Sequence, residues 1–496
     1  MKNAVKGIIG LCAALAVLGG GLAALKLTEP DETEDSSSVS SEASGSGIQL
    51  IKDEEISSVR VTKGSQVLNI VVKDEKTEDS AATYTIEGYE DVPLTTAKVG
   101  TIPNNAKGLT SDSIVAENCT ELSKYGFDDP QAEAEITFAS GEKVNFIIGD
   151  TAPVTSETYF MFSGDDTVYT VATGSVSNYK SDIKDFVSTT ILEEPDEADY
   201  PTVNSLKIQR DDLDYDIVLE YNEKSEDSAY SGGTTATHIM TQPTFSYLAV
   251  ERSTAITNGM FGLSADGIYS ILPGEAEIAE AGLSSPFCTV TMSCSNDTDY
   301  VLYLSEPFTD EEGKKCHYAM MKDGKVIYIV SAEDAQWGTV MPIDITSKMY
   351  FGSYVWNITD MKVSCDGVDD EFKIQLKEES ADKESTSAED YDVTRNGEPF
   401  DAERYRSFVA FLIKGAAEDF AYDEKLPSGE PMASVEYMEK SSGKIQKIEF
   451  YDYSALNALI AIDGESKYFC SKSYVETLIE NAKRIETGEE YLTTWK

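Results

Sequence analysis

One plan of strands and turns recurs three times along this chain, and this recurrence limits its fold more than any other feature. Each copy opens with two alternating apolar stretches around a polar turn: ISSVRVTKGSQVLNIVVKD from Ile56, VNSLKIQRDDLDYDIVLEY from Val203 and ITDMKVSCDGVDDEFKIQLKE from Ile358. Because successive side chains of a strand point to opposite faces, each segment predicts a hairpin with one face packed and the other in water.

A turn and a second set of strands follow in each copy. YGFDDP, which begins at Tyr125, returns as AGLSSP from Ala281, and the third copy keeps only the proline. Glycine tolerates a positive φ, and proline biases the residue before it away from helix. We therefore expect a turn that ends a helix and starts a strand, built on Gly126, Pro130, Gly282, Pro286 and Pro431.

A helix is predicted between the two sets of strands, most clearly in the third copy. There, Tyr405 is followed by apolar residues at i+3, i+4, i+7 and i+8, which places an apolar stripe on one helical face. Asp401 suits the N-cap of this helix. We expect the stripe to pack on the strands of its own copy, and binding of a partner is the alternative.

The prolines of the three turns are spaced by about 150 residues, which is the size of a domain rather than of a solenoid repeat. The predicted fold class is α+β: an N-terminal transmembrane helix followed by three tandem strand-rich modules, each an antiparallel sheet with one or two helices. The predicted limits are 1–26 for the helix, 27–48 for a disordered Ser-rich and acidic linker, and 49–192, 200–346 and 354–490 for the three modules.

The N-terminus predicts a membrane anchor. Lys2 and Lys6 precede an apolar run over residues 7–25, which spans about 28 Å as a helix and so matches the hydrocarbon core of a bilayer. Positive charge before the run and an acidic linker after it favour a single-pass protein of the cell membrane, with a cytoplasmic N-terminus and an extracellular body. A cleaved signal peptide is the alternative. A lipoprotein signal is disfavoured because Leu11 precedes Cys12.

Charge and cysteine content exclude several classes of protein. Asp and Glu number 89 against 40 Lys and Arg, so the formal charge is −49 and binding of nucleic acid is not expected. No EF-hand loop is present to store cations. Six cysteines lie beyond the apolar run, too widely spaced for a zinc pattern or a dense disulfide framework, and we expect buried free thiols.

The search for catalytic chemistry is negative. The two histidines, His238 and His317, belong to no H-E-x-x-H motif, and neither G-x-S-x-G nor a P-loop occurs. Two S-x-x-K matches, at 177–180 and 441–444, lack the K-T-G element of a penicillin-binding site. We therefore predict no catalytic, cofactor-binding or metal-binding residues and no enzyme. A hydrolase without a recognisable motif is the minor alternative.

Aromatic residues concentrate where the second and third modules meet. Tyr350, Phe351, Tyr354 and Trp356 fall within residues 348–357. Packing between modules is one interpretation of this cluster. A contact surface for protein or carbohydrate is the other, because aromatic side chains are amphipathic contact residues.

The first copy resembles a known family. LSKYGFDDPQAEAEITFASGEKVNFIIGD, followed by TYFMFSGDDTVYTVA, is similar to the core of domain-of-unknown-function family 4340 (DUF4340). Tyr125, Gly126 and Pro130 match the family's turn, and Gly149 and Asp150 match the Gly-Asp ending of its strand. The resemblance covers residues 56–190 well and 203–345 more loosely, and the third copy departs from it at the turn.

This resemblance implies a function. Members of the family are single-pass extracytoplasmic proteins that often accompany ABC-type export systems of the gliding-motility class, and the resemblance carries over no catalytic residues. It implies a non-enzymatic accessory or scaffold protein whose partners are the membrane and ABC transporter permease or ATPase subunits. A wall-associated or cell-surface binding protein, adhesin-like or glycan-binding, is the alternative.

Overall fold

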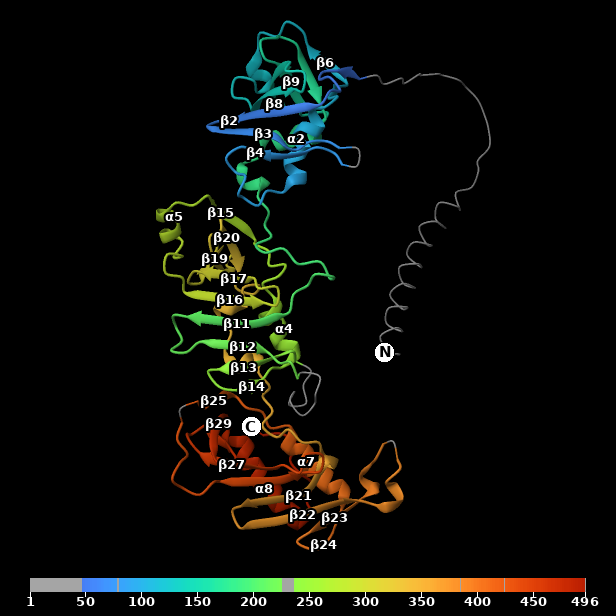
Figure 1. Ribbon diagram of the computed structural model, residues 1–496, viewed down its shortest axis with the longest axis vertical. Coiled ribbons are helices and arrows are strands. Elements are labelled where there is room, and N and C mark those ends of the chain that lie inside the picture. Colours follow the sequence, from blue (N-terminus) through green and yellow to red (C-terminus); the bar gives the residue numbers. More distant parts are fainter. Residues whose placement is uncertain (1–46, 78–79, 225–235, 384, 423, 496) are drawn as a thin grey trace, which may run out of the picture.

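The computed structural model describes residues 47–495 apart from 78–79, 225–235, 384 and 423, and it forms three lobes stacked in a column (Figure 1). The fold is strand-rich α+β with antiparallel sheets and a few helices, as predicted. The predicted transmembrane helix over residues 1–26, and nearly all of the predicted linker, lie outside the described residues. Within the described part, no helix is long and apolar enough to span a bilayer.

The first module contains an eight-stranded sheet with the order β4-β3-β2-β7-β8-β9-β10-β6. A short separate pair, β1 with β5, lies beside it. Its elements are β1 (Ile48–Gln49), β2 (Ile56–Lys63), β3 (Gln66–Asp74), β4 (Thr83–Ile86), α2 (Thr96–Ala106), β5 (Thr110–Ser111), β6 (Ser113–Ala116), β7 (Ala132–Phe138), β8 (Lys143–Thr151), β9 (Thr158–Phe162), β10 (Val168–Val171) and α3 (Thr173–Val176).

The second module has the order β14-β13-β12-β11-β16-β17-β19-β20-β15, and β18 pairs with β19. Its elements are β11 (Val203–Arg210), β12 (Ile217–Tyr221), β13 (His238–Gln242), β14 (Ser246–Tyr247), α4 (Val250–Asn258), β15 (Gly267–Ile271), α5 (Glu275–Glu280), β16 (Cys288–Cys294), β17 (Asp299–Leu304), β18 (Phe308–Thr309), β19 (Lys315–Met321), β20 (Val326–Ser331) and α6 (Pro342–Ile345).

The third module has the order β24-β23-β22-β21-β26-β27-β28-β29-β25. Its elements are β21 (Ile358–Cys365), β22 (Val368–Leu376), β23 (Tyr391–Arg395), β24 (Glu398–Phe400), α7 (Ala402–Ile413), β25 (Asp419–Phe420), β26 (Ala433–Glu439), β27 (Ile445–Asp452), β28 (Asn457–Ile462), β29 (Glu465–Ser471) and α8 (Lys472–Thr487).

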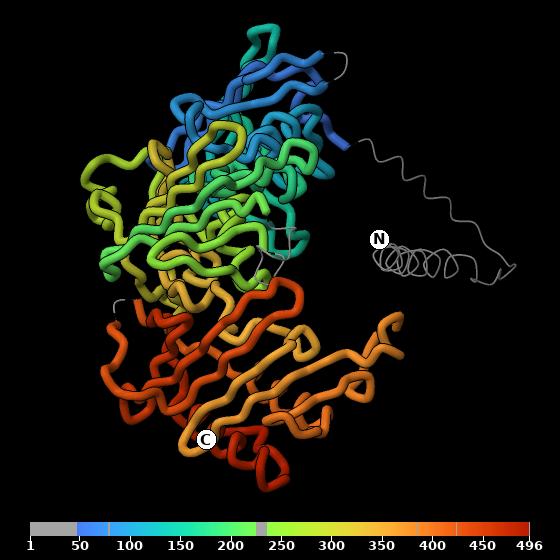
Figure 2. The backbone as a smooth tube through the Cα atoms, turned by 60° about the horizontal axis from the view of Figure 1, so that its bottom comes forward, coloured from blue at the N-terminus to red at the C-terminus, as the bar shows by residue number. Residues whose placement is uncertain are grey.

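The three sheets follow one path through space (Figure 2). The opening hairpin is extended to one edge of the sheet by one further strand in the first module and by two in the second and third, and a helix then carries the chain across to the other edge. The strand at that edge, which is β6, β15 or β25, is followed by four strands that lie between it and the opening hairpin, and in the second module β18 pairs beside them. The recurring sequence pattern therefore corresponds to a recurring topology.

The predicted alternation is confirmed at the opening hairpins. The inward positions of β2, β11 and β21 are all buried: Val59, Val61, Leu206, Ile208, Met361 and Val363. Each module has its own apolar core between the sheet and its helices. A smaller apolar cluster lies apart from each of these cores, and in the first two modules it includes the residue on either side of the turn glycine.

The modules are joined by chain pairing and by apolar packing. The segment that leaves the first module pairs with the second at Thr190 and Ser264, and Ala417 of the third donates its N–H to the Lys348 carbonyl at 2.8 Å. Val187 of the first module and Phe420 of the third both belong to the core cluster of the second. One apolar cluster therefore runs through both junctions.

Candidate functional site

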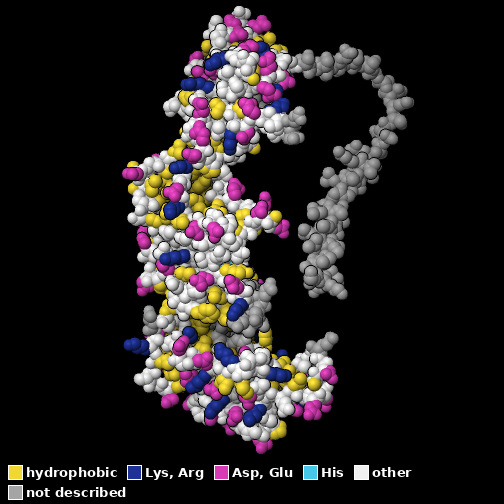
Figure 3. Space-filling view, in the orientation of Figure 1, with side chains coloured by type: hydrophobic (Ala, Val, Ile, Leu, Met, Phe, Trp, Pro, Cys, Tyr) yellow, Lys and Arg dark blue, Asp and Glu magenta, His cyan; other side chains and the backbone are white. Residues whose placement is uncertain are grey.

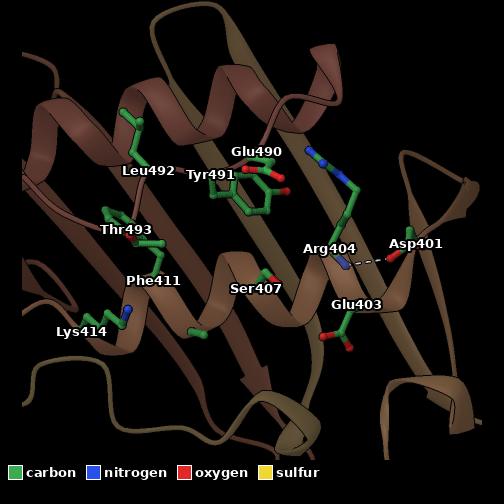
Figure 4. A pocket seen from close by; sticks show the side chains of 11 residues that line it. Asp401, Glu403, Arg404, Ser407, Phe411, Lys414, Glu490, Tyr491, Leu492 and Thr493 are labelled. Atoms are coloured by element: carbon green, nitrogen blue, oxygen red, sulfur yellow. Dashed lines mark hydrogen bonds between the residues drawn. The ribbon is translucent and has the colours of Figure 1, made fainter.

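A groove of about 540 Å³ opens on the third module between α7 and the C-terminal segment (Figure 4). It is lined by Asp401, Glu403, Arg404, Ser407, Ala410, Phe411 and Lys414 on α7 and its N-cap, and by Glu490, Tyr491, Leu492 and Thr493 opposite. We call it the α7 groove.

Helix α7 presents one polar face to this groove because its apolar face is used elsewhere. Tyr405, Phe408, Val409 and Leu412 are buried in the third core, which confirms the predicted stripe and its packing on the module's own sheet. The Asp401 carboxylate accepts a hydrogen bond from the Arg404 N–H at 2.8 Å, so the predicted N-cap is also confirmed.

Arg404 fixes the opposite wall. Its guanidinium donates to the carbonyls of Arg484, Gly488 and Glu489 at 2.9, 3.0 and 3.0 Å. The Arg484 carbonyl lies in the last turn of α8, where it also accepts the Gly488 N–H at 3.1 Å, and Gly488 and Glu489 follow the helix. The guanidinium therefore lies at the end of α8 where the helix dipole favours a cation. The same guanidinium lies 4.9 Å from the centre of the Tyr491 ring.

A second clamp holds the C-terminal segment in an extended course. Asn481 on α8 donates to the Leu492 carbonyl at 2.9 Å and accepts from the Leu492 N–H at 2.7 Å. Burial raises the pKa of Tyr491, while the charge of Arg404 opposes that rise. The wall of the groove is therefore held by backbone contacts and is not a loose end.

The groove suits binding better than catalysis. Its lining combines the apolar surfaces of Phe411 and Leu492 with carboxylates and one lysine, and it includes no histidine or cysteine to activate the Ser407 hydroxyl. An extended polar chain is the kind of ligand that such an open, mixed surface can hold. The α7 stripe predicted this helix, but nothing in the sequence indicated that the chain end would return to it.

A buried carboxylate of the third module was missed by the sequence analysis. Asp370 points into the core from β22, where it accepts hydrogen bonds from Arg395 at 2.6 Å and Asn396 at 3.0 Å. A buried ion pair of this kind is costly to break from one side. Both contacts are made to one carboxylate oxygen, and the other, also buried, has no hydrogen-bond partner among the described residues.

The motif residues of the first module meet in one place. Gly126 has a φ of +77°, as predicted, and a Cβ there would lie 2.5 Å from the Asp150 carboxyl carbon. A Cβ on Gly149 would lie 2.2 Å from the Tyr125 carbonyl oxygen. The turn and the strand ending are thus packed against each other, with Pro130 two residues ahead of β7.

The counterparts in the other modules occupy the same positions in the path. Gly282 has a φ of +72°, and Pro286 and Pro431 each stand two residues before the strand that follows the turn, β16 or β26. None of these residues lines the α7 groove. Their positions fit the architectural role predicted for them.

The four aromatic residues of the predicted contact surface are not brought together on one surface. Tyr350 and Phe351 are buried in the third core. Trp356 stacks on Tyr391 with ring centres 4.1 Å apart. Tyr354 alone is mostly exposed, at 75%. Alternation of polar and apolar neighbours did not reveal this, because the segment is irregular and its exposure depends on tertiary packing.

The two histidines and three cysteines of the second module are buried. Burial lowers the pKa of both His238 and His317, and their ring nitrogens contact the carbonyls of Val203 and Ser305, each at 2.7 Å. Burial raises the pKa of Cys288 to about 12, so its thiol stays protonated at neutral pH. The six described cysteines are free, as predicted. In the described ranges, no group of side chains is arranged to hold a metal ion.

Acidic side chains are spread over all three lobes on the face seen in Figure 3, among fewer basic ones. Ion pairs are mostly exposed, such as Lys483 with Asp366 at 2.5 Å, and each contributes little to stability. The surface therefore favours cationic over anionic ligands.

Comparison with known proteins bears on part of the chain. A family model described as "Domain of unknown function (DUF4340)" matches residues 85–286. The match begins in β4 and ends at Pro286, so it covers most of the first module and the opening half of the second. This confirms the resemblance to the family, over a different span from the one expected. No curated protein matches the chain, and neither does a solved structure.

Proposed function

We propose that this chain, whose residues 85–286 carry a DUF4340 domain, is a non-enzymatic accessory or scaffold component of an ABC-type transport system. The apolar N-terminal run anchors it in the cell membrane with a cytoplasmic N-terminus. The three modules then stand on the extracytoplasmic side, where they contact the permease or ATPase-bearing complex.

The observation that carries this proposal is the continuous apolar cluster through both junctions. Val92 and Ile191 of the first module, and Ala417 of the third, pack into the core of the second. Interfaces between domains that bury apolar side chains resist relative motion. Modules joined in this way keep fixed positions relative to one another, as a scaffold requires.

The α7 groove gives the column a binding function. It lies on the third module, at the other end of the column from the first module, so a component bound there is held at a fixed distance from the first module (Figure 1). By contrast, the alternative of a glycan-binding surface at residues 348–357 loses support, because Tyr350 and Phe351 are buried.

The test is co-purification of transporter subunits with the full chain from crosslinked membranes. Ala410→Arg places a long side chain in the α7 groove at an exposed position, and Ala279→Arg makes the same change on the exposed surface of α5. We expect the first variant to lower recovery of the permease at least five-fold and the second to leave it unchanged. Recovery of no transporter subunit with the unaltered chain would refute the proposal.

A further inference from the structure

The edge strand of the first module, β6, differs from its counterparts in the exposure of its apolar side chains. It forms the outer edge of its sheet, as β15 and β25 do in the second and third. Ile114 and Val115 on β6 are 43% and 38% exposed. We call these two residues and their strand the β6 edge.

The register of the strands shows that the three edges are equivalent. In each module a tyrosine of the adjoining strand stands opposite one apolar residue of the edge strand: Tyr169 opposite Ile114, Tyr328 opposite Ile268 and Tyr468 opposite Phe420. Ile114 therefore holds the position that Ile268 and Phe420 hold in the later modules.

Those two counterparts pack on the apolar cluster that runs through both junctions, Phe420 fully and Ile268 in part. Ile268 packs on the cluster that includes Val187 of the first module, and Phe420 is buried in the same cluster by the second. Among the described residues, Ile114 belongs to none of the apolar clusters and lacks the cover that its equivalents have.

The opposite free end of the column is protected in the usual way. Its outermost strand, β24, exposes Glu398 and Pro399, and charges and proline on an edge prevent strand addition. The β6 edge is short and its pairing with β10 skips Val115, but within the strand it exposes β-branched apolar residues and no charge or proline, which is the composition that accepts another strand. The two free ends are therefore not alike.

The charge around the β6 edge selects the partner. Asp112 and Glu117 flank the strand and are exposed, and the whole chain has a formal charge of −49. A second copy would bring like charges together, whereas basic side chains would be attracted. The short pair of β1 with β5 lies next to this edge, because β5 directly precedes β6 in the chain (Figure 1).

From these observations we infer that the β6 edge is a docking site for an extended segment of a partner protein, apolar at its centre and basic at both ends. The segment adds to β6 as a further strand and covers Ile114 and Val115. The identity of the partner as a transport component rests on the proposed function, whereas the chemistry of the edge does not.

The inference is tested with peptides and the full chain. The probe is a labelled peptide with a Val-Ile-Val centre and two lysines at each end; one control replaces the lysines with glutamates and another replaces the central Ile with Pro. We expect the lysine peptide to bind at least ten-fold more tightly than either control, and Ile114→Lys to abolish binding while Leu456→Lys, at a site 79% exposed on the third module, does not. Absent or equal binding of the peptides overturns the inference.

A photocrosslinker at position 115 in intact membranes gives an independent result. Crosslinking to another protein through a segment with basic ends supports the inference, and crosslinking of the chain to itself overturns it in favour of a second copy. If the peptide binds but no transporter subunit is recovered with the chain, the proposed function fails and the docking site stands.

Discussion

The turn before β7 in the first module and the turn before β16 in the second follow one path but are packed differently. Ala132 pairs with Ile148 and Cys288 pairs with Leu304, so Gly149 and Ser305 are the next residues in equivalent positions. In the first module the Tyr125 carbonyl lies where a Cβ of Gly149 would be. In the second a serine with a full side chain is accepted.

In the second module, the space between the turn and the sheet is not filled. A hollow of about 380 Å³ lies beside Gly282 and Ser305, whereas the Asp150 side chain occupies the equivalent place beside Gly126. Topology is therefore conserved between the two modules without conservation of packing. The strand pattern sets the path of the chain, and a few small residues set how closely the turn approaches the sheet.

The largest expected effect comes from Gly149→Ala. The new Cβ meets a backbone oxygen that cannot move without shifting the turn, so we expect a loss of about 3 kcal/mol and a fall in the first module's melting temperature of roughly 6–12 °C. Thermal unfolding followed by calorimetry measures it. The matched change, Ser305→Ala, removes only a hydroxyl that accepts the Tyr318 N–H at 3.0 Å and costs about 1 kcal/mol. Equal losses would show that the two turns are packed alike.

Alanine at the turn glycines separates backbone strain from contact. Both glycines have a positive φ, which costs an alanine about 1 kcal/mol. At Gly282 the nearest atom to the new Cβ is 3.7 Å away, so strain is the whole cost, but at Gly126 the Asp150 carboxyl is in the way and the loss rises to about 2–3 kcal/mol. Denaturant unfolding of the two variants gives the difference, and a smaller loss for Gly126→Ala than for Gly282→Ala would contradict it.

Acid should weaken the second module but not the first, which has no histidine. The pKa values of His238 and His317 are lowered from 6.5 by burial, so the unfolded chain binds more protons, and their contribution is present above pH 6.5 and lost as the pH falls below it. The loss at pH 6 is at most about 0.8 kcal/mol for each histidine. Hydrogen exchange at pH 7.5 and pH 5.5, corrected for intrinsic rates, should show loss of protection in β13 and β19 before β7 and β8.

The smallest effect is expected from the prolines, and it should be the same in both modules. Pro130→Ala and Pro286→Ala raise the conformational entropy of the unfolded chain and leave the packing of both turns unchanged. Each substitution therefore lowers the free energy of unfolding by about 0.5–1 kcal/mol. Melting temperatures of the two variants provide the measurement. A clearly larger loss at one site would show that its proline also packs in the folded state.

The opening hairpins and α7 were predictable because the periodic spacing of their apolar residues shows which face of each element is packed. Met361 and Val363 alternate along β21, and Tyr405, Phe408 and Val409 follow helical spacing, so one face is apolar whatever the neighbours are. The close approach of the Tyr125 carbonyl to Gly149 was not predictable, since the two residues are distant in sequence. The limits of the three modules and the transport function stay predictions.

The aromatic cluster at residues 348–357 is a second feature that the local sequence pattern did not determine. The sequence left open whether Tyr350 and Phe351 pack between modules or form a contact surface, because the segment has no clear period, and in the structure both are buried in the core of the third module. The α7 groove depends in turn on the return of residues 489–493 to Arg404, a contact between helix ends. Neither feature can be predicted from the local spacing of apolar and polar residues.

By itself, the sequence determined the recurring strand plan, the turn glycines and prolines, the acidic surface and the apolar leading run, because each is a property of neighbouring residues. Only the tertiary structure decided which apolar residues are covered. Ile114, Ile268 and Phe420 are equivalent in register, yet the last two are packed at junctions and the first is not. Burial depends on what lies across from a side chain, and that neighbour comes from another module or from another molecule.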